Sequence, residues 1–230
     1  MRALLLAAGF GTRLRPLTDY VPKCMVPIHG VPLLEYWINL LPPDIVEKIL
    51  VNTHYLPDVV CSYVKSSPWC DRIQIVHEEM LLGTGGTILK NSEFFGKDTF
   101  FLAHADNLSR FDFKEFYAAH LNRPLGTDIT MMTFTSDSPK SCGIVEQDSE
   151  GRAIKFFEKV ENPPGDCANG AVYIIEPSVI DYLQRKNSNV IDFSTEVIPN
   201  YLGKIYCFHN NNYHRDIGTP ESLALAEMEF

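Results

Sequence analysis

The sequence lacks the apolar length that a membrane-spanning helix requires. Its longest apolar runs, 3–8 and 100–103, fall far short of the roughly 20 residues that cross a bilayer. The N-terminus also lacks a charged lead followed by a long apolar stretch and a small-residue cleavage site. We therefore expect a cytoplasmic protein with no membrane partner.

The cysteines and histidines are too scattered for a recognisable metal or redox site. None of the six cysteines forms a C-x-x-C pair, and none of the seven histidines an H-x-x-H or H-E-x-x-H arrangement. A chain of 230 residues can also build a core without a disulfide framework. We expect reduced and structural thiols.

An excess of positive charge is missing as well. The formal net charge is −9, whereas a nucleic-acid surface needs a basic face, so no nucleic-acid partner is expected. Small anionic substrates stay compatible, because a few cations in one cleft can outweigh an acidic exterior. Functional cations should therefore be few and local.

What is present is an alternation of strand and helix patterns over the first 110 residues. The expected strands are 1–8, 48–53, 72–77 and 99–104, and the expected helices are 32–41, 58–65 and 87–95. This order is typical of a parallel sheet with helices on both faces. In such sheets ligands bind beyond the carboxyl ends of the strands.

Beyond residue 110 the pattern becomes richer in strands. The expected strands are 128–135, 143–147, 153–158, 168–175 and 204–209, and the expected helices are 111–120, 177–185, 194–201 and 220–229. Asp148–Gly151 is predicted as a hairpin turn, because glycine accepts a positive φ. Without an internal repeat or a low-complexity linker, one domain with two functional halves is expected.

The first strand ends in a glycine loop that carries two cations. Gly9 and Gly11 form the loop, and Arg13 and Lys23 follow it. Backbone N–H groups of such a loop can face an anion without side-chain obstruction. A guanidinium adds a fork of donors for phosphate oxygens, and a lysine adds a mobile charge. The segment therefore predicts a polyphosphate site.

Two other phosphate-binding loops do not fit this segment. A dinucleotide fingerprint would place a third glycine where Leu14 stands, and a P-loop would need Gly-Lys followed by Ser or Thr. The remaining alternative is a tight turn that happens to contain Arg and Lys. The pattern is much longer than a lone G-x-G, which favours phosphate binding.

The run from Leu6 to Pro27, with Gly-x-Gly-Thr-Arg-Leu-x-Pro and a later Pro-Lys, closely resembles the sugar-1-phosphate nucleotidyltransferases. The resemblance implies an α/β fold with a Rossmann-like, mostly parallel mixed sheet flanked by helices (GT-A-like) and an added β-rich half. It places a nucleotide-binding half at about 1–110 and a sugar-phosphate-binding half at about 111–230. It also implies an enzyme that joins an NTP to a sugar-1-phosphate and releases pyrophosphate.

Further motifs extend the resemblance along the chain. Glu79–Thr87 resembles the family's base-recognition loop, although Thr84 or Thr87 could instead cap a helix. Asp106, after an apolar strand, and Asp216, in Asp-Ile-Gly-Thr-Pro, resemble the family's Mg²⁺ ligands. Mg²⁺ prefers such hard oxygen ligands, whereas each aspartate taken separately suggests a surface residue.

The second half of the chain resembles the family's sugar-phosphate site. The resemblance implies that Glu158 and Asn169 bind sugar hydroxyls, that Lys159 holds the sugar phosphate, and that the backbone of Gly143 approaches the sugar. Glu–Lys pairs are also common on solvated faces. Ala105 departs from a position where the family frequently has glycine. No hexapeptide repeats follow, so a catalytic domain alone is expected.

The resemblance thus implies a defined set of site residues. The catalytic residues are Arg13, Lys23 and Asp106, and the metal ligands are Asp106 and Asp216. The nucleotide-binding residues are Leu6, Ala8, Gly9, Gly11, Thr12, Arg13, Lys23, Glu79, Gly83 and Thr84. The sugar-phosphate-binding residues are Gly143, Glu158, Lys159 and Asn169.

The Gly83-Thr-Gly-Gly loop resembles the guanylyltransferases of mannose- or heptose-type phosphates, which makes GTP the expected nucleotide. Uridylyl or cytidylyl transfer to another sugar- or alcohol-phosphate stays open. Two other functions are alternatives. A nucleotide-sugar-dependent glycosyltransferase usually presents Asp-x-Asp, whereas residues 104–106 contain one aspartate. A non-catalytic sensor of sugar nucleotides could lack Arg13, Lys23 and both aspartates, yet all four are present. The expected cofactor is Mg²⁺ and the expected partners are the two small substrates; a homo-oligomer stays open.

Overall fold

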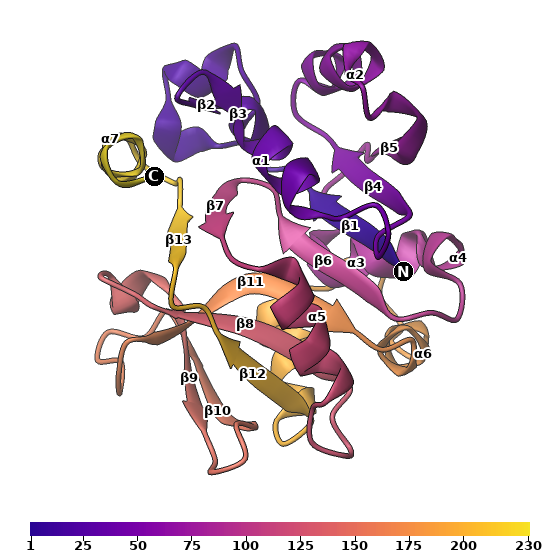
Figure 1. The fold of residues 1–230 in the computed structure, drawn as a ribbon, viewed down its shortest axis with the longest axis vertical. Helices are drawn as coiled ribbons and strands as arrows, with labels where there is room; N and C mark the ends of the chain where they lie inside the picture. The colour runs from indigo at the N-terminus through magenta and orange to yellow at the C-terminus, as the bar shows by residue number, and fades with distance from the viewer. The chain divides into compact units, whose positions relative to one another are not determined.

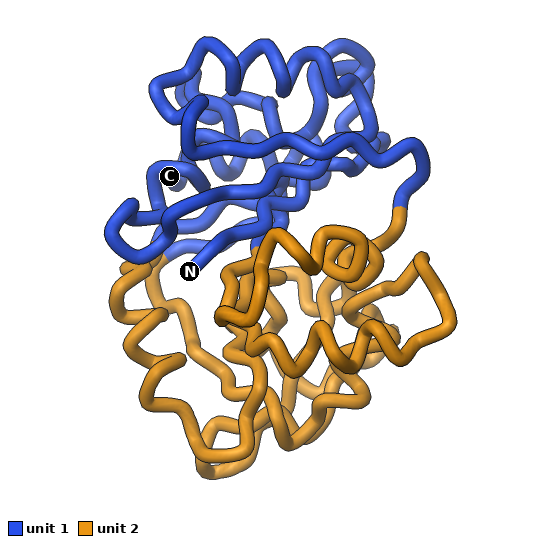
Figure 2. The backbone as a smooth tube through the Cα atoms, turned by 90° about the vertical axis from the view of Figure 1, so that its right-hand side faces the viewer, with its two compact units in different colours: residues 1–81, 103–110, 213–230 blue, residues 82–102, 111–212 orange.

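The computed structural model describes all 230 residues, which form two compact units (Figure 2). Unit 1 comprises residues 1–81, 103–110 and 213–230, and unit 2 comprises residues 82–102 and 111–212. Each unit therefore combines segments that are distant in the sequence. None of the helices has the length and apolar character needed to span a bilayer.

Unit 1 is built on three parallel strands (Figure 1). β1 (Arg2–Leu6) pairs with β4 (Lys48–Thr53), and β4 pairs with β5 (Ile73–His77). β1 and β4 are buried along most of their length, as expected for strands covered on both faces. The carboxyl ends of all three strands lie at one edge.

Three helices belong to unit 1: α1 (Leu33–Leu40), α2 (Pro57–Ser66) and α7 (Pro220–Glu229). α1 buries Leu33, Leu34, Trp37 and Ile38, the 3-to-4 spacing of one helix face. The two short strands β2 (Pro27–Ile28) and β3 (Val31–Pro32) pair with each other before α1.

Two short strands that the sequence did not predict complete unit 1. β7 (Asn107–Arg110) and β13 (Tyr213–Asp216) pair antiparallel, with Asp216 opposite Asn107. A hydrophobic cluster packs beside them; its buried members are Leu14, Val26, Ile28, Leu33, Leu108, Ile217 and Ala226. The late Asp-Ile-Gly-Thr-Pro motif is thereby fixed next to residue 106.

Unit 2 contains a sheet that is mainly antiparallel. β8 (Ile129–Thr135) pairs antiparallel with β11 (Cys167–Ile175) and parallel with β12 (Ile205–His209). β9 (Gly143–Gln147) pairs antiparallel with β10 (Ala153–Glu158) and with β11. β6 (Phe100–His104) carries the chain from unit 2 into unit 1.

The predicted hairpin turn between β9 and β10 is confirmed. Gly151 has φ 76°, and the Asp148 side chain accepts hydrogen bonds from the N–H groups of Glu150 and Arg152. The side chain therefore replaces backbone partners in the turn, which is the usual role of aspartate there.

The helices of unit 2 are α3 (Gly83–Lys90), α4 (Ser92–Phe95), α5 (Phe113–Leu121) and α6 (Ser178–Gln184). The single helix expected at 87–95 is thus two helices. The helix expected at 194–201 is present but is not a regular α-helix: a π-helix (Phe193–Val197) leads into a 3-10 helix (Ile198–Tyr201) that contains Pro199. Proline lacks the N–H that a continuing α-helix would need there.

The predicted α/β class, with a mixed sheet flanked by helices, is confirmed.

A buried histidine in unit 2 gives the fold a pH dependence. His120 on α5 is 1% exposed, with Nδ1 2.8 Å from Thr130 Oγ1 and Nε2 3.1 Å from Glu176 Oε1. Burial and the neighbouring Arg123 charge lower the pKa of His120 to about 4, although Glu176 opposes the shift. The neutral imidazole is therefore the form that the fold holds at pH 7.

We expect stability to fall as the pH drops from about 6.5 towards 4, because the unfolded chain binds a proton that the folded protein resists. The full effect is worth up to roughly 3 kcal/mol. Urea unfolding at pH 7, 5.5 and 4.5 measures it, and His120→Gln should flatten the slope. His209→Gln, at an exposed histidine of the same unit, is the control. Equal slopes for all three proteins would contradict the assignment.

Candidate functional site

The glycine loop after β1 is held in a fixed conformation. Gly11 has φ 62°, the left-handed region that glycine tolerates, and its carbonyl accepts a 2.7 Å hydrogen bond from Thr18 Oγ1. The next residues, Thr12–Leu14, form a 3-10 turn in which Leu14 is buried and Arg13 remains exposed. The Arg13 guanidinium therefore stands at the surface on an anchored backbone.

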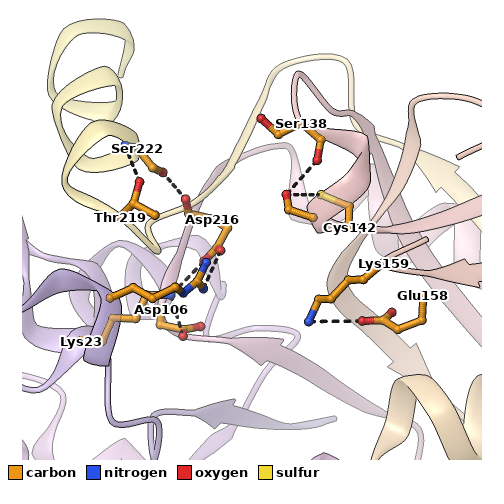
Figure 3. A network of polar contacts seen from close by, with 11 residues as sticks. Lys23, Asp106, Ser138, Cys142, Glu158, Lys159, Asp216, Thr219 and Ser222 are labelled. Carbon is orange, nitrogen blue, oxygen red and sulfur yellow. Dashed lines mark hydrogen bonds and ion pairs between the residues drawn. The ribbon is translucent and has the colours of Figure 1, made fainter. Parts of the chain in front are cut away.

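The centre of the site in unit 1 is a lysine between two carboxylates (Figure 3). Lys23 Nζ lies 2.9 Å from Asp106 Oδ2 and 2.8 Å from Asp216 Oδ1. Arg13 Nη2 is 3.4 Å from the other Asp216 oxygen. Lys23 is only 6% exposed. Four residues that the sequence singled out, separated by up to 203 positions, thus form one cluster.

Hydrogen bonds from neighbouring segments hold the two aspartates in place. Asp106 follows β6, and the N–H of the preceding Ala105 donates to the Leu6 carbonyl at the end of β1. Beyond it, the Asn107 carbonyl accepts a 2.8 Å hydrogen bond from the buried Trp37 indole. Asp216 ends β13 opposite Asn107. The ladder between β7 and β13 therefore brings the two aspartates together.

The start of α7 fixes the backbone at Asp216. Ser222 Oγ donates to the Asp216 carbonyl, and the Thr219 side chain caps the helix by accepting from the Ser222 N–H (Figure 3). A Cβ on Gly218 would lie 2.7 Å from both Arg13 Nη2 and Asp216 Oδ2. Glycine at 218 is thus what lets the arginine reach the aspartate.

The opposite charges in the cluster stabilise one another in their ionised forms. Burial alone would raise the pKa of Asp106, but the charges of Lys23 and His104 and the hydrogen bond from Lys23 hold it below its ordinary value. Burial alone would lower the pKa of Lys23, yet the two aspartates raise it. Lys23 and Asp106 are therefore both charged at neutral pH.

The Asp106–Asp216 pair has the chemistry of a Mg²⁺ site. Both residues offer hard carboxylate oxygens, and the spacing of the carboxylates lets one ammonium contact an oxygen of each. No third Asp, Glu, His or Cys joins them in a metal-binding group. Mg²⁺ commonly takes one or two carboxylates and completes its shell with water and substrate phosphate. The residues present fit that ion.

The remaining predicted nucleotide-binding residues have different environments. Leu6 ends β1, Ala8 is buried, and Gly9 is exposed, with Asp106 Oδ2 4.0 Å from where its Cβ would stand. Glu79 is exposed in the segment after β5. In unit 2, Gly83 and Thr84 open α3, whose N-cap is Leu82, so the alternative that Thr84 or Thr87 caps the helix is wrong.

The glycines at the start of α3 have a packing role that the sequence did not reveal. A Cβ on Gly83 would lie 2.6 Å from the Ile191 carbonyl oxygen, and one on Gly85 2.8 Å from the Ile191 side chain. The Gly85 N–H donates to the Ile191 carbonyl at 2.9 Å. These two glycines are therefore required by the contact with residue 191, whatever else binds at the loop.

The predicted sugar-phosphate-binding residues lie on neighbouring strands of unit 2. Gly143 on β9 pairs directly with Glu158 on β10, and Ala168 on β11 pairs with Ile144. Asn169 therefore stands beside the same pair. Its Oδ1 accepts from the Ala171 N–H at 2.9 Å, and its Nδ2 donates to Tyr173 Oη at 2.7 Å. The register brings three of the four residues together.

The fourth residue, Lys159, has a strained backbone. Its φ is 49°, which is uncommon for a residue other than glycine, and its N–H donates to the Cys142 carbonyl. Its Nζ lies 3.4 Å from Glu158 Oε1 and is largely exposed (Figure 3). Strain of this kind persists only where the surroundings impose it, and it is enriched at binding sites.

Sequence reasoning missed two polar residues in unit 1. Asn52, the second-last residue of β4, and Glu78, after β5, are 2% and 1% exposed. Glu78 adjoins Glu79, which the motif pointed to instead. A polar residue near the end of a buried strand was the available signal, but only the structure shows that the two side chains meet, with Asn52 Nδ2 3.1 Å from Glu78 Oε1.

The chain resembles known proteins along its whole length. The nucleotidyl transferase family matches residues 2–230. A mannose-1-phosphate guanylyltransferase from Mycobacterium tuberculosis is 34% identical over 226 residues, which cover 96% of this chain and 62% of that relative. The chain thus spans less than two thirds of that relative's length.

Two solved structures share the fold. HddC from Yersinia pseudotuberculosis, complexed with GMP-PN, has a TM-score of 0.80 and 26% identity, and the match covers 100% of this chain and 99% of HddC. A structure from Bacillus anthracis described as a candidate glucose-1-phosphate thymidylyltransferase has a TM-score of 0.87 at 20% identity, covering 99% and 94%. The match over residues 2–230 confirms the resemblance found from the motifs: the chain belongs to the nucleotidyl transferase family.

Proposed function

We propose that this protein transfers a nucleoside monophosphate from an NTP to a sugar-1-phosphate, giving an NDP-sugar and pyrophosphate. The observation that carries the proposal is the position of Lys23 between Asp106 and Asp216, with Arg13 at the edge of the same cluster. Carboxylates that can hold a divalent cation, beside cations that can hold phosphates, are recurring parts of phosphoryl-transfer sites. The proposed partners are the two small-molecule substrates, the NTP and the sugar-1-phosphate.

The proposed nucleotide is GTP, and the proposed acceptor is a mannose- or heptose-type 1-phosphate. The relative from Mycobacterium tuberculosis is named for guanylyl transfer to mannose-1-phosphate, and HddC was solved with GMP-PN. Both matches cover at least 96% of this chain. A uridylyl- or cytidylyltransferase acting on another sugar- or alcohol-phosphate is the alternative substrate assignment.

In the proposed reaction, an oxygen of the sugar phosphate forms a bond to the α-phosphorus, and the bond from that phosphorus to the bridging oxygen of pyrophosphate breaks. Arg13 and the backbone of Gly9–Gly11 would stabilise the charge that develops on pyrophosphate. Lys23 would contact the triphosphate, and Lys159 would hold the attacking phosphate. The nucleophile is already an anion, so no general base is needed.

The proposed cofactor is Mg²⁺, held by Asp106 and Asp216. When bound, the ion would offset negative charge on the phosphate oxygens, so that two anions can approach each other. Asp106 keeps its charge for this role, because Lys23 lowers its pKa. Asp216 stays oriented by the Ser222 and Thr219 contacts at the start of α7.

Pyrophosphate release tests the proposal. Purified protein and Mg²⁺ are mixed with each of four NTPs against a panel of sugar-1-phosphates. We expect release that needs both substrates and is fastest with GTP and a mannose- or heptose-type phosphate. Reactions without sugar phosphate are the control. No release with any pair would reject the transferase activity, and release with UTP or CTP alone would reject only the choice of nucleotide.

The same panel separates the proposed function from two further candidates, because neither of them releases pyrophosphate. A glycosyltransferase would release a nucleoside diphosphate from a nucleotide sugar, and a sensor would bind sugar nucleotides without turnover. The single aspartate after β6 and the full set Arg13, Lys23, Asp106 and Asp216 favour the transferase over both.

A further inference from the structure

One side chain connects the loops that follow two strands of unit 1. The Ala7 N–H, just past β1, donates to Asn52 Oδ1 at 2.8 Å. Asn52 Nδ2 in turn donates to Glu78 Oε1, just past β5, at 3.1 Å. Asn52 is opposite Leu6, in the last pair between β4 and β1, and opposite Val76, in the second-last pair between β4 and β5. The amide therefore contacts the first residue after β1 and the first residue after β5.

A second pair of contacts links the same two loops through His54, the residue after β4. His54 Nδ1 lies 2.6 Å from the Glu78 carbonyl oxygen. The Phe10 ring, between the two loop glycines, packs edge-on against the His54 ring with centroids 5.2 Å apart. The loop after β1 is thus linked to Glu78 twice, from Ala7 through Asn52 and from Phe10 through His54.

We propose that Asn52 is a positioning residue for the nucleotide, because it fixes the backbone that leads into the glycine loop relative to Glu78 and the adjoining Glu79. This inference rests on the proposed function and adds a residue to it. An asparagine suits the position because one group must accept from a backbone N–H and donate to a carboxylate at once. Neither aspartate nor leucine can do both.

The Asn52 bridge, its hydrogen bonds to Ala7 and Glu78, lies in one unit only, which separates a role in positioning the nucleotide from a role in general stability. Asn52 and Glu78 are both in unit 1, where Arg13, Lys23 and the glycine loop also lie. The predicted sugar-phosphate residues Glu158 and Lys159 belong to unit 2. Loss of the bridge should therefore weaken the handling of NTP and leave the apparent affinity for sugar phosphate unchanged.

Exchanging the amide of Asn52 and the carboxylate of Glu78 tests the inference. In Asn52→Asp, one carboxylate oxygen still accepts from Ala7, but the other faces the Glu78 carboxylate at close range. We expect KM for NTP to rise by about tenfold or more, as for other displaced binding groups. The double variant Asn52→Asp/Glu78→Gln restores a donor–acceptor pair with the same net charge. We expect it to recover to within about threefold of wild type.

The control is Asn210→Asp, which changes a buried asparagine of unit 2 that accepts from the Asn212 N–H. It should leave KM for NTP unchanged. Melting temperatures are measured for every variant, and the affinity for GMP-PN is measured by calorimetry as well. If Asn52→Asp fails to fold, the folded double variant and Glu78→Leu carry the same comparison.

An unchanged KM for NTP in Asn52→Asp would overturn the inference. So would an equal rise in both KM values, or a folded double variant without recovery. If wild-type protein releases no pyrophosphate with any substrate pair, the proposed function fails instead. The calorimetric affinities then decide on Asn52: weakening in the single variant with recovery in the double supports positioning, and equal affinities overturn it.

Discussion

Asp106→Asn is expected to lower the rate of pyrophosphate release at least about 100-fold, the scale of losing one positioned electrostatic group in catalysis. The substitution keeps the shape of the side chain and removes the charge that lies 2.9 Å from Lys23 Nζ. It also leaves Asp216 as the only carboxylate of the cluster. The measurement is kcat at saturating NTP, sugar phosphate and Mg²⁺.

A matched control distinguishes this loss from a loss of folding. Asp112→Asn makes the same change at the N-cap of α5, where asparagine caps as well as aspartate, and turnover should stay near wild type. Asp106→Asn should still melt cooperatively, because Lys23 keeps its 2.8 Å contact with Asp216. Turnover of Asp106→Asn within tenfold of wild type would exclude a central role for this aspartate.

The sequence predicted the elements with strong patterns and missed those without them. The apolar runs of β1, β4 and β8 and the 3-to-4 spacing of α1 and α2 indicated each element within about two residues. β7 and β13 have four residues each and mostly polar sequences, Asn-Leu-Ser-Arg and Tyr-His-Arg-Asp. Such strands are specified by the cluster around Leu108 and Ile217, which no local pattern encodes.

The candidate site shows the same division. Motifs identified Arg13, Lys23, Asp106 and Asp216 as separate residues, and only the ladder between β7 and β13 shows that one lysine contacts both aspartates. The packing of the α3 glycines on residue 191 depends on a contact across about 100 positions. Hydrophobic periodicity carries information about local structure, whereas such contacts depend on register and turn geometry.

The position of Asn52 was also beyond reach from the sequence. Its role follows from being opposite Leu6 and Val76, so that its amide can reach Ala7 and Glu78. A strand pattern alone does not show which groups an asparagine near the end of β4 contacts. The residue that the motif suggested, Glu79, is exposed, while its neighbour Glu78 points into the unit.

Lys23→Met is expected to have two opposite effects: turnover falls at least about 100-fold, and the affinity for Mg²⁺ alone rises about tenfold or more. The first follows from losing a cation beside the proposed triphosphate site. The second follows because the Lys23 ammonium now lies 2.8 and 2.9 Å from the two oxygens that a metal would use. At 4 Å and an effective dielectric constant of 20, two unit charges interact by about 4 kcal/mol, and about 1.4 kcal/mol is already tenfold in affinity.

Titration calorimetry with Mg²⁺ or Mn²⁺, without nucleotide, measures the second effect. The melting temperature of Lys23→Met should also rise more steeply with metal concentration than that of wild type, because metal binding stabilises the folded state. Lys155→Met, which removes an exposed ion pair with Glu146, is the control and should change neither quantity. If the affinity for metal falls in Lys23→Met, then Lys23 orients the carboxylates for the ion. If it rises, Lys23 competes with the ion for them, and in the proposed reaction the lysine must leave the aspartates for the phosphates when the metal and the nucleotide bind together.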